Sequence, residues 1–330
     1  MTSSAQFSRI QVGNAPAYVV ALDPEATDPL TQALRTGFHP YHYIADLIAS
    51  LVGPTERVVD VGAHVGSIGL CAAAAGAEVL AIEGSQTNAE LIRQAVTVNH
   101  FRSVDVLNIA VSDHEGELAF IANGPWGHLS TQGELAQNPA IARMACASLD
   151  SILDRLQWTN VRLVKIDIEG GEYSAFQGAQ RLLGGDDAPY VVYESNEVTS
   201  EMMNHTSIEL MEVMEKFGYR HYIIKPDHRL IPAAVGYFQT ETIVDYLCAK
   251  RDLPPIPGWS VTSPLSASEV IDEIVAECEF PVAAHRASIG ARLRRAPSWC
   301  RSDSRVLAAV RALTQDSEES VRTAVQWSAS

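Results

Sequence analysis

The chain has 330 residues, of which 47% are hydrophobic and 19% are charged, a composition that supports a folded core and excludes a disordered protein. Its net charge of −16 disfavours a nucleic-acid partner, because neutralising phosphates requires an excess of Lys and Arg. The sequence has no apolar run of about 18 residues, so no membrane span is expected. The N-terminus lacks the basic and apolar segments of a secretory signal. The five cysteines form no CxxC pair, so we expect reduced thiols in a cytoplasmic protein, without disulfides or a zinc site.

Residues 1–56 predict an N-terminal arm that contains a hairpin and a helix. Residues 57–250 alternate apolar strand-like runs with helical stretches, the pattern of a parallel α/β sheet. The strand-like runs lie at 57–62, 77–83, 104–111, 161–169, 190–195, 220–225 and 240–248. The expected helices lie at 68–75, 88–99, 149–156, 174–183 and 201–217. The polar segment 124–139 is long for a connection, and such loops are more often functional than decorative.

A change of composition marks the C-terminal part of the chain. Four prolines predict a linker at 251–265, because proline is excluded from helix interiors and central strands. Residues 266–330 predict a helical extension that begins with a capping box of Ser266 and Glu269, and a later helix is expected from Asp316 to about Val325. Residues 282–330 carry a net charge of +4, beside an acidic body at −20. This contrast suggests that the extension covers the body or mediates self-association, so a homo-oligomer is one expected assembly.

The segment DVGAHVG, from Asp60 to Gly66, follows an apolar strand-like run. Gly62 and Gly66 allow the backbone to turn tightly into a helix, whose N-terminus favours negative groups. Glu83 ends the next run, 21 residues after Gly62, and a carboxylate at that spacing can accept both ribose hydroxyls. The two features together predict a nucleoside site, whereas a glycine turn that served only the fold would leave Glu83 unexplained.

The positions of the glycines distinguish between nucleosides. A dinucleotide fingerprint requires glycine at 62, 64 and 67, but His64 and Ser67 occupy the last two, where side chains would clash with a pyrophosphate. S-adenosylmethionine has no pyrophosphate, and its ammonium group suits Asp60. We therefore expect S-adenosylmethionine to bind at Asp60, Gly62, His64, Gly66, Ser67 and Glu83. An NAD-dependent oxidoreductase and a non-catalytic nucleoside-binding or scaffold protein are the alternatives.

The run VRLVKIDIEGGE places Lys165, Asp167 and Glu169 on one face of a strand. Ligands bind at the carboxyl ends of such strands, and buried carboxylates need a partner there. Asp167, aided by Glu169, could remove the proton from an acceptor hydroxyl as methyl transfer proceeds. Alternatively, the carboxylates could hold a divalent cation such as Mg²⁺ that lowers the pKa of the acceptor. The alternative for Asp167 is a salt bridge to Lys165 or Arg162 that only fixes the loop.

Three further features are candidates for the same site. His128, in the loop NGPWGHLSTQG, could be a general base because His titrates near neutral pH, although a solvated loop His is the ordinary alternative. Glu194 lies near the end of the run YVVYES, and could share a metal with Asp167 and Glu169 or bind the methionine ammonium. The aromatic segment FHPYHYI at 38–44 could stack on a sugar, although the apolar side of an arm helix is the favoured explanation.

Five segments occur in a characteristic order: DVGAHVG, AIEGSQTNAELIRQAVTVNH, NIAVSDHEGE, LVKIDIEGGEYSAFQGAQRLL and YVVYES. Together they resemble the FkbM-type S-adenosylmethionine-dependent methyltransferases over residues 57–197, and KIDIEGGE is the most specific of them. The resemblance implies a class I, Rossmann-like α/β fold with a mostly parallel seven-stranded sheet and helices on both faces. It also implies O-methylation of a sugar or natural-product hydroxyl in secondary metabolism. His64 stands where the family usually has Asn, and Ser85 or Gln86 where it usually has Pro.

Overall fold

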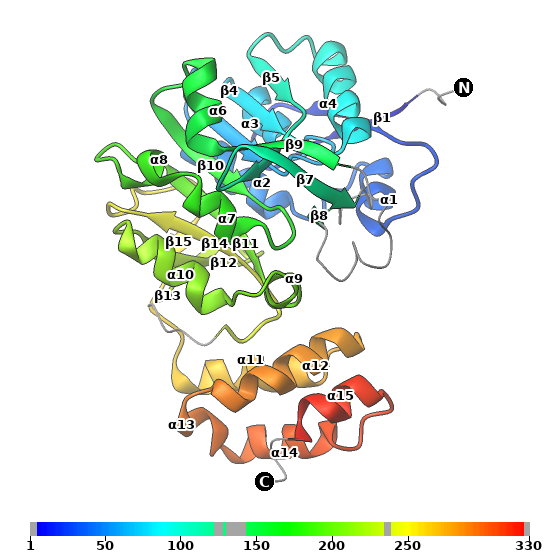
Figure 1. Cartoon of the computed structure of the whole chain (residues 1–330), viewed down its shortest axis with the longest axis vertical. Helices are drawn as coiled ribbons and strands as arrows, with labels where there is room; N and C mark the ends of the chain where they lie inside the picture. The colour runs from blue at the N-terminus through cyan, green and yellow to red at the C-terminus, as the bar shows by residue number, and fades with distance from the viewer. Residues whose placement is uncertain (1–4, 122–127, 130–142, 234–238, 327–330) are drawn as a thin grey trace.

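The computed structural model of the protein describes residues 5–121, 128–129, 143–233 and 239–326. A nine-stranded sheet with the order β15-β13-β12-β14-β11-β10-β3-β4-β5 forms its centre (Figure 1). The strands are β3 (Arg57–Val61), β4 (Glu78–Ile82), β5 (Val104–Leu107), β10 (Val161–Ile166), β11 (Tyr190–Asn196), β12 (Arg220–Ile224), β13 (Arg229–Ala233), β14 (Ile243–Ala249) and β15 (Ser260–Val261).

Seven of these strands form the sheet that the sequence predicts. β5, β4, β3, β10 and β11 are parallel, and β14 runs antiparallel between β11 and β12. The mostly parallel sheet of a class I methyltransferase fold is therefore confirmed, and β13 and β15 extend it at one edge. The chain leaves β3 toward β4 and β5 and then returns to β10 on the other side, so the strand order reverses between β3 and β10. In open α/β sheets this is the point at which a crevice forms at the carboxyl ends of the strands.

Helices cover both faces of the sheet, as expected. One face packs against α6 (Leu149–Leu156), α7 (Glu172–Gln177), α8 (Gln180–Gly184) and α10 (Ser207–Lys216). The other packs against α2 (His42–Leu51), α3 (Gly69–Ala74) and α4 (Gln86–Val98). Two predicted helices are each divided in two: 174–183 contains parts of α7 and α8, and 201–217 contains the end of α9 (Glu197–Met202) and α10. The second division has a local cause, because a capping box at Thr206 and Glu209 begins a new helix.

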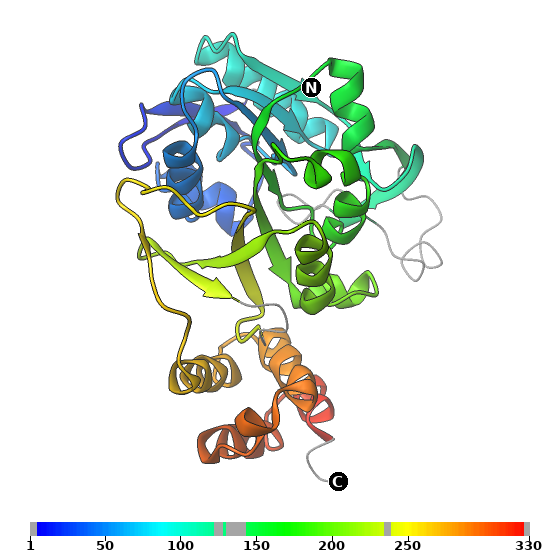
Figure 2. The ribbon, with the colours of Figure 1, turned by 90° about the vertical axis from the view of Figure 1, so that its left-hand side faces the viewer.

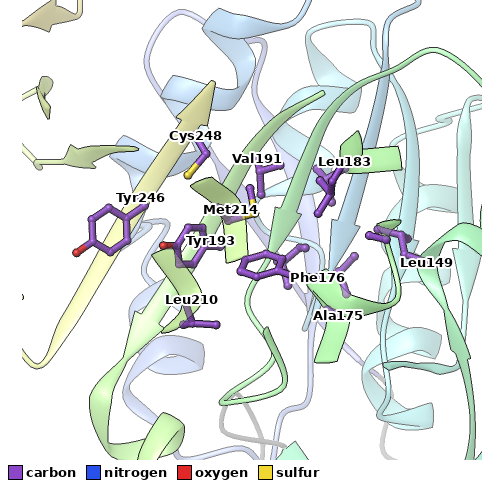
Figure 3. Packing of buried hydrophobic residues seen from close by; sticks show 14 of the residues in the cluster. Leu149, Ala175, Phe176, Leu183, Val191, Tyr193, Leu210, Met214, Tyr246 and Cys248 are labelled. Carbon is purple, nitrogen blue, oxygen red and sulfur yellow. The ribbon is translucent and has the colours of Figure 1, made fainter. Parts of the chain in front are cut away.

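Aromatic side chains hold β11 in the core. Phe176 packs edge to face against Tyr193, with ring centroids 5.2 Å apart, and Tyr193 lies 5.3 Å from Tyr246 of β14 (Figure 3). Such pairs stabilise a fold beyond the area that they bury. The five cysteines are free and buried, in agreement with the expectation of reduced thiols.

The N-terminal arm contains the hairpin β1 (Gln6–Ile10) and β2 (Tyr18–Leu22), and two helices, α1 (Pro29–Arg35) and α2, where one was expected. Asp28 caps α1 by accepting a hydrogen bond from the Thr31 amide at 2.7 Å, and Pro29 occupies the first helical position. The Tyr18 hydroxyl donates a hydrogen bond to the carbonyl of Ser67. The arm is therefore attached directly to the glycine turn.

A second sheet with the order β6-β9-β7-β8 follows β5, and the sequence did not predict it. It consists of β6 (Ala110–Ser112), β7 (Gly116–Ile121), β8 (His128–Leu129) and β9 (Arg143–Ser148). The predicted strand 104–111 covers β5 and part of β6, which lie in different sheets. Most of the predicted functional loop 124–139 lies outside the described residues.

The helical extension lies at one end of the molecule (Figures 1 and 2). Its helices are α11 (Ala267–Cys278), α12 (Ala283–Arg292), α13 (Ser298–Arg301), α14 (Ser304–Leu313) and α15 (Glu319–Ala324). The capping box of Ser266 and Glu269 is confirmed at the start of α11. The extension has a hydrophobic cluster of its own, although the boundaries of the four regions stay predictions. None of the described helices combines the length and the apolar character needed to cross a membrane.

Candidate functional site

A pocket of about 210 Å³ opens where the strand order reverses, at the carboxyl ends of β3 and β10. It brings together the arm, the glycine turn, the end of β10 and the end of β11. The lining residues are Pro29, Leu30, Pro40, Tyr41, Gly62, Ala63, His64, Ser67, Ile68, Lys165, Asp167, Glu169 and Glu194. Three of the six predicted cofactor residues line it, together with the three predicted carboxylates.

The glycine turn brings β3 and β10 into direct backbone contact. Gly62 has a φ of +75°, and a Cβ at this position would lie 1.8 Å from the carbonyl oxygen of Asp167. The Asp167 amide donates a hydrogen bond to the carbonyl of Val61 at 3.1 Å. His64 also has a left-handed backbone, with a φ of +52°. Asn and His are among the residues that tolerate this conformation best, which accounts for His64 where the family usually has Asn.

Asp60 lies behind the turn, with only 1% of its surface exposed. Its carboxylate accepts a hydrogen bond from the Gly69 amide at 3.0 Å and lies 3.5 Å from Nζ of Lys165. Burial raises the pKa of Asp60, and the charge of Lys165 opposes this effect. Asp60 therefore shapes the turn and its electrostatics and does not line the pocket.

Glu83 also supports the turn. Its two carboxylate oxygens accept hydrogen bonds from the amides of His64, at 2.8 Å, and of Ser85, at 2.7 Å. Burial raises the pKa of Glu83 to about 7, although these amide bonds favour the ionised form. Gly66, with a φ of +77°, packs its backbone against Leu70. Glu83 and Gly66 thus set the backbone path, whereas Gly62, His64 and Ser67 face the pocket.

Lys165 is the one Lys or Arg among the residues that line this pocket. Its ammonium donates a hydrogen bond to the carbonyl of Gly62 at 3.0 Å and lies 3.2 Å from Oδ2 of Asp167. Burial would lower the pKa of Lys165, but the carboxylates of Asp167 and Asp60 outweigh it and raise the pKa. The salt bridge considered for Asp167 is therefore present, and Lys165 keeps its charge.

Asp167, Glu169 and Glu194 bring carboxylate oxygens within 4.8 Å of one another. β10 ends at Ile166, so Asp167 and Glu169 do not continue the strand as the alternation predicted. Glu169 instead lies in a turn with a φ of +52° and still reaches the pocket. Burial and the charge of Asp167 raise the pKa of Glu169 to about 8, and the same two causes raise the pKa of Glu194 well above its ordinary value.

Glu172, the first residue of α7, holds this turn. Its carboxylate accepts hydrogen bonds from the amides of Ile168, at 2.8 Å, and of Gly170, at 3.0 Å. Burial raises its pKa to about 7. The second glutamate of KIDIEGGE thus stabilises the turn from which Glu169 projects.

Two features of the site were missed or left open by the sequence. Asp245 on β14 is paired in register with Glu194 and accepts a hydrogen bond from the Tyr43 hydroxyl at 3.1 Å. Burial raises the pKa of Asp245 to about 7. Asp245 could have been found from the sequence as an acidic residue within the apolar run 240–248. In the aromatic segment, Tyr41 lines the pocket while His39 is buried.

His128 belongs to β8, where its backbone pairs with Ile121 of β7. Its side chain lies outside the described part of the structure, as does most of the loop 123–133. The role of His128 as a general base therefore stays a prediction.

The chain is similar in structure to several solved methyltransferases. Precorrin-6y C5,15-methyltransferase from Geobacter metallireducens GS-15 is 12% identical, with 64% of this chain and 87% of that chain covered and a TM-score of 0.36. The METTL16 methyltransferase domain is 12% identical, with 74% and 73% covered and a TM-score of 0.41. A TehB-like SAM-dependent methyltransferase from Corynebacterium glutamicum is 15% identical, with 67% and 93% covered and a TM-score of 0.39. No curated protein matches the chain.

The comparison with protein families gives a specific result. Residues 60–221 match the family model described as the methyltransferase FkbM domain. This range begins at Asp60 and contains the glycine turn, the carboxylates of the KIDIEGGE turn and Glu194. Residues 60–221 of the chain therefore form an FkbM domain, a domain of S-adenosylmethionine-dependent methyltransferases.

Proposed function

We propose that the protein transfers the methyl group of S-adenosylmethionine to a hydroxyl group of a small molecule, such as a sugar or another natural product. The observation that carries this proposal is the group of Asp167, Glu169 and Glu194 beside the glycine turn. An acceptor hydroxyl needs a group that removes its proton, and carboxylates can do this.

The residues of the pocket fit S-adenosylmethionine better than NAD. The absence of a side chain at Gly62 leaves backbone exposed to a ligand, and the carboxylates suit a positively charged cofactor. A pyrophosphate would meet these carboxylates, while Lys165 is already paired with Asp60 and Asp167. We assign Gly62, His64 and Ser67 to direct contact with the cofactor. Asp60, Gly66 and Glu83 are assigned to the same site as residues that shape it.

Asp167 is the proposed catalytic residue. S-adenosylmethionine supplies an electrophilic methyl group on its sulfonium when it is bound. Lys165 holds the Asp167 carboxylate in place, and this carboxylate would accept the acceptor's hydroxyl proton as the carbon–oxygen bond forms and the methyl–sulfur bond breaks, which leaves a neutral thioether. The pKa of Glu169 is raised to about 8 and that of Glu194 is also raised, so Glu169 keeps its proton near neutral pH and can donate a hydrogen bond to an acceptor oxygen.

A divalent cation such as Mg²⁺ is the second way in which this site could activate the acceptor. The clustered oxygens of Asp167, Glu169 and Glu194 suit a hard cation, although Lys165 already neutralises part of their charge. If the metal route is correct, EDTA abolishes turnover and Mg²⁺ restores it. If the His128 route is correct, EDTA has no effect and His128→Ala is the impaired variant.

Two measurements test the proposed function. Calorimetry with S-adenosylmethionine and with NAD should show binding of the first alone. Metabolite extracts incubated with the protein and trideuteromethyl-labelled S-adenosylmethionine should yield a labelled O-methyl product. Binding of NAD, or of neither cofactor, would favour the alternative classes. A labelled N-methyl or C-methyl product would keep the methyltransferase and exclude O-methylation.

A further inference from the structure

The C-terminal extension contacts the sheet through charged side chains that are buried. Arg292, the last residue of α12, is 8% exposed; its guanidinium donates a hydrogen bond to the carbonyl of Gln239 and lies 3.7 Å from Oε1 of Glu197. Glu197 is the first residue of α9 and is 5% exposed. Because α9 follows β11 directly, Arg292 is connected to the end of the strand that carries Glu194.

Glu277 of α11 makes a second contact of this kind. It is 8% exposed, and its carboxylate accepts hydrogen bonds from the amide of Thr242, at 3.0 Å, and from its hydroxyl, at 2.8 Å. Thr242 in turn accepts a hydrogen bond from the Glu197 amide at 3.0 Å, and the side-chain amide of Gln239 donates one to the carbonyl of Ser195 at 3.0 Å. The contact thus joins the end of β11 to the beginning of β14.

Glu197 and Thr242, which the extension contacts, both lie close to the site. Glu197 is three residues after Glu194, and Thr242 is three residues before Asp245, which is paired in register with Glu194. α9 also packs on the turn that carries Glu169: a Cβ at Gly170 would lie 2.7 Å from the carbonyl of Thr199 and 3.0 Å from Cγ of Met203. α12 contacts α9 from the other side (Figure 1).

We propose that the extension positions the carboxylates of the site. Arg292 and Glu277 are positioning residues that hold α9, the end of β11 and the beginning of β14, so that Glu194 and Glu169 face the pocket. An attachment alone could be made by apolar side chains, whereas buried charges require specific partners and so fix one arrangement. The inference rests on the proposed function in taking these carboxylates as the acceptor side of the pocket.

Arg292→Leu and Arg286→Leu form a matched pair for the test. Arg286 lies on the same helix, but it binds Asp316 within the extension, at 2.8 and 3.0 Å, and makes no described contact with the sheet. Methionine methyl NMR of the full chain, with the Met203 signal assigned by Met203→Leu, reports on the contact between α9 and Gly170. The Met203 signal should shift or broaden in Arg292→Leu, stay unchanged in Arg286→Leu, and return toward its original position in Arg292→Lys.

Kinetics with the acceptor found in the metabolite experiment give a second readout. In Arg292→Leu, turnover should fall at least about tenfold because the acceptor-side groups are displaced, while the Kd for S-adenosylmethionine changes by less than about twofold. In Arg286→Leu, both quantities should stay near their original values. If Arg292→Leu does not fold, Glu277→Gln removes the charge of the same contact and Thr242→Val removes one of its hydrogen bonds, and each should produce the same Met203 change.

The Met203 signal decides the proposal without an acceptor. An unchanged Met203 signal in Arg292→Leu, or an equal change in Arg286→Leu, would overturn it, because the extension would then be only a stabilising appendage. Failure of the proposed function has a different signature, since the unmodified protein would then not bind S-adenosylmethionine at all.

Discussion

Lys165 and the carboxylates around it set the chemistry of the site. Two acidic side chains, Asp60 and Asp167, share this lysine, while Glu169 and Glu194 have no described ion pair. Burial and the charge of Asp167 raise the pKa values of Glu169 and Glu194, and at Glu169 the charge of Lys165 opposes this effect only in part. The pocket therefore contains one paired carboxylate and two that hold protons more strongly, a division that suits different catalytic tasks.

Asp167→Asn tests the paired carboxylate. The change keeps the shape of the side chain and removes the charge, so turnover should fall at least about 100-fold while the affinity for S-adenosylmethionine changes little. Initial rates at saturating acceptor and calorimetry measure the two effects. Asp154→Asn, which alters an exposed ion pair with Arg181, is the control and should match the unmodified protein. Near-normal turnover of Asp167→Asn would make this residue structural.

Glu169 gives a prediction about pH. A carboxylate with a pKa of about 8 is mostly protonated at neutral pH and becomes a base only above it. Because protonated Glu169 is proposed to donate a hydrogen bond to the acceptor, turnover should fall as pH rises through about 8, and Glu169→Gln, whose amide still donates, should remove this fall. A fall near pH 8 that persists in Glu169→Gln would assign the titration to another group.

Glu83→Ala tests the support of the glycine turn. The change removes the acceptor for two backbone amides, including that of His64, so cofactor affinity should fall by about 1–3 kcal/mol. Calorimetry with S-adenosylmethionine measures the loss, and circular dichroism shows whether the variant is folded. Unchanged affinity in a folded variant would remove Glu83 from the cofactor site.

At the scale of elements, the site depends on two strand ends that touch. β3 and β10 contact each other beyond their ladder, because the Gly62 backbone lies against the carbonyl of Asp167. The space between Gly62 and this carbonyl oxygen is too small for a methyl group. The turn between β3 and α3 therefore tolerates no side chain at this position.

Gly62→Ala should be strongly destabilising, because the new methyl group meets a backbone atom at 1.8 Å and the φ of +75° adds strain. We expect a loss of about 2–4 kcal/mol of unfolding free energy, together with loss of cofactor binding. Gly218→Ala is the matched control: its φ is +88°, but nothing lies within 4 Å of the new Cβ. It should cost only about 1 kcal/mol. If urea unfolding shows equal losses of unfolding free energy for the two variants, the positive φ, and not the close contact, would account for the destabilisation.

At the scale of the whole molecule, buried titratable groups make stability depend on pH in two opposite ways. Burial raises the pKa of Glu83, Glu172 and Asp245 to about 7, and that of Glu169 to about 8. The folded chain therefore holds protons that the unfolded chain has released, and stability decreases as pH rises through 7 to 8. Burial lowers the pKa of His39, His64 and His221 to about 4, so stability also decreases as pH falls below the ordinary value of 6.5.

We therefore expect a loss of about 2–4 kcal/mol of unfolding free energy between pH 6.5 and 8.5, where these carboxyl groups ionise in the folded chain. Urea unfolding followed by circular dichroism at the two pH values measures this loss. The double variant Glu169→Gln and Asp245→Asn should reduce it, because neither amide titrates. Equal or greater stability at pH 8.5 would contradict the prediction.

The sequence by itself determined the features that depend on neighbouring residues. The alternation of strands and helices, the glycine turn at Gly62 and the capping box at Ser266 are each written within a few positions, because backbone conformation and capping are local. The motifs then identified the family, and ligand binding at the carboxyl ends of parallel strands placed Asp167 and Glu194 in one pocket.

Only the tertiary structure decided what depends on contacts between distant segments. The pairing of Asp245 with Glu194 follows from strand register, and the division of the run 104–111 between two sheets follows from which partner each part meets. The inward turn of Glu83 toward two amides and the contact of Arg292 with Glu197 have no local signal. Such contacts form because buried polar groups need partners, and the packed core holds those partners, which are distant in sequence, next to one another.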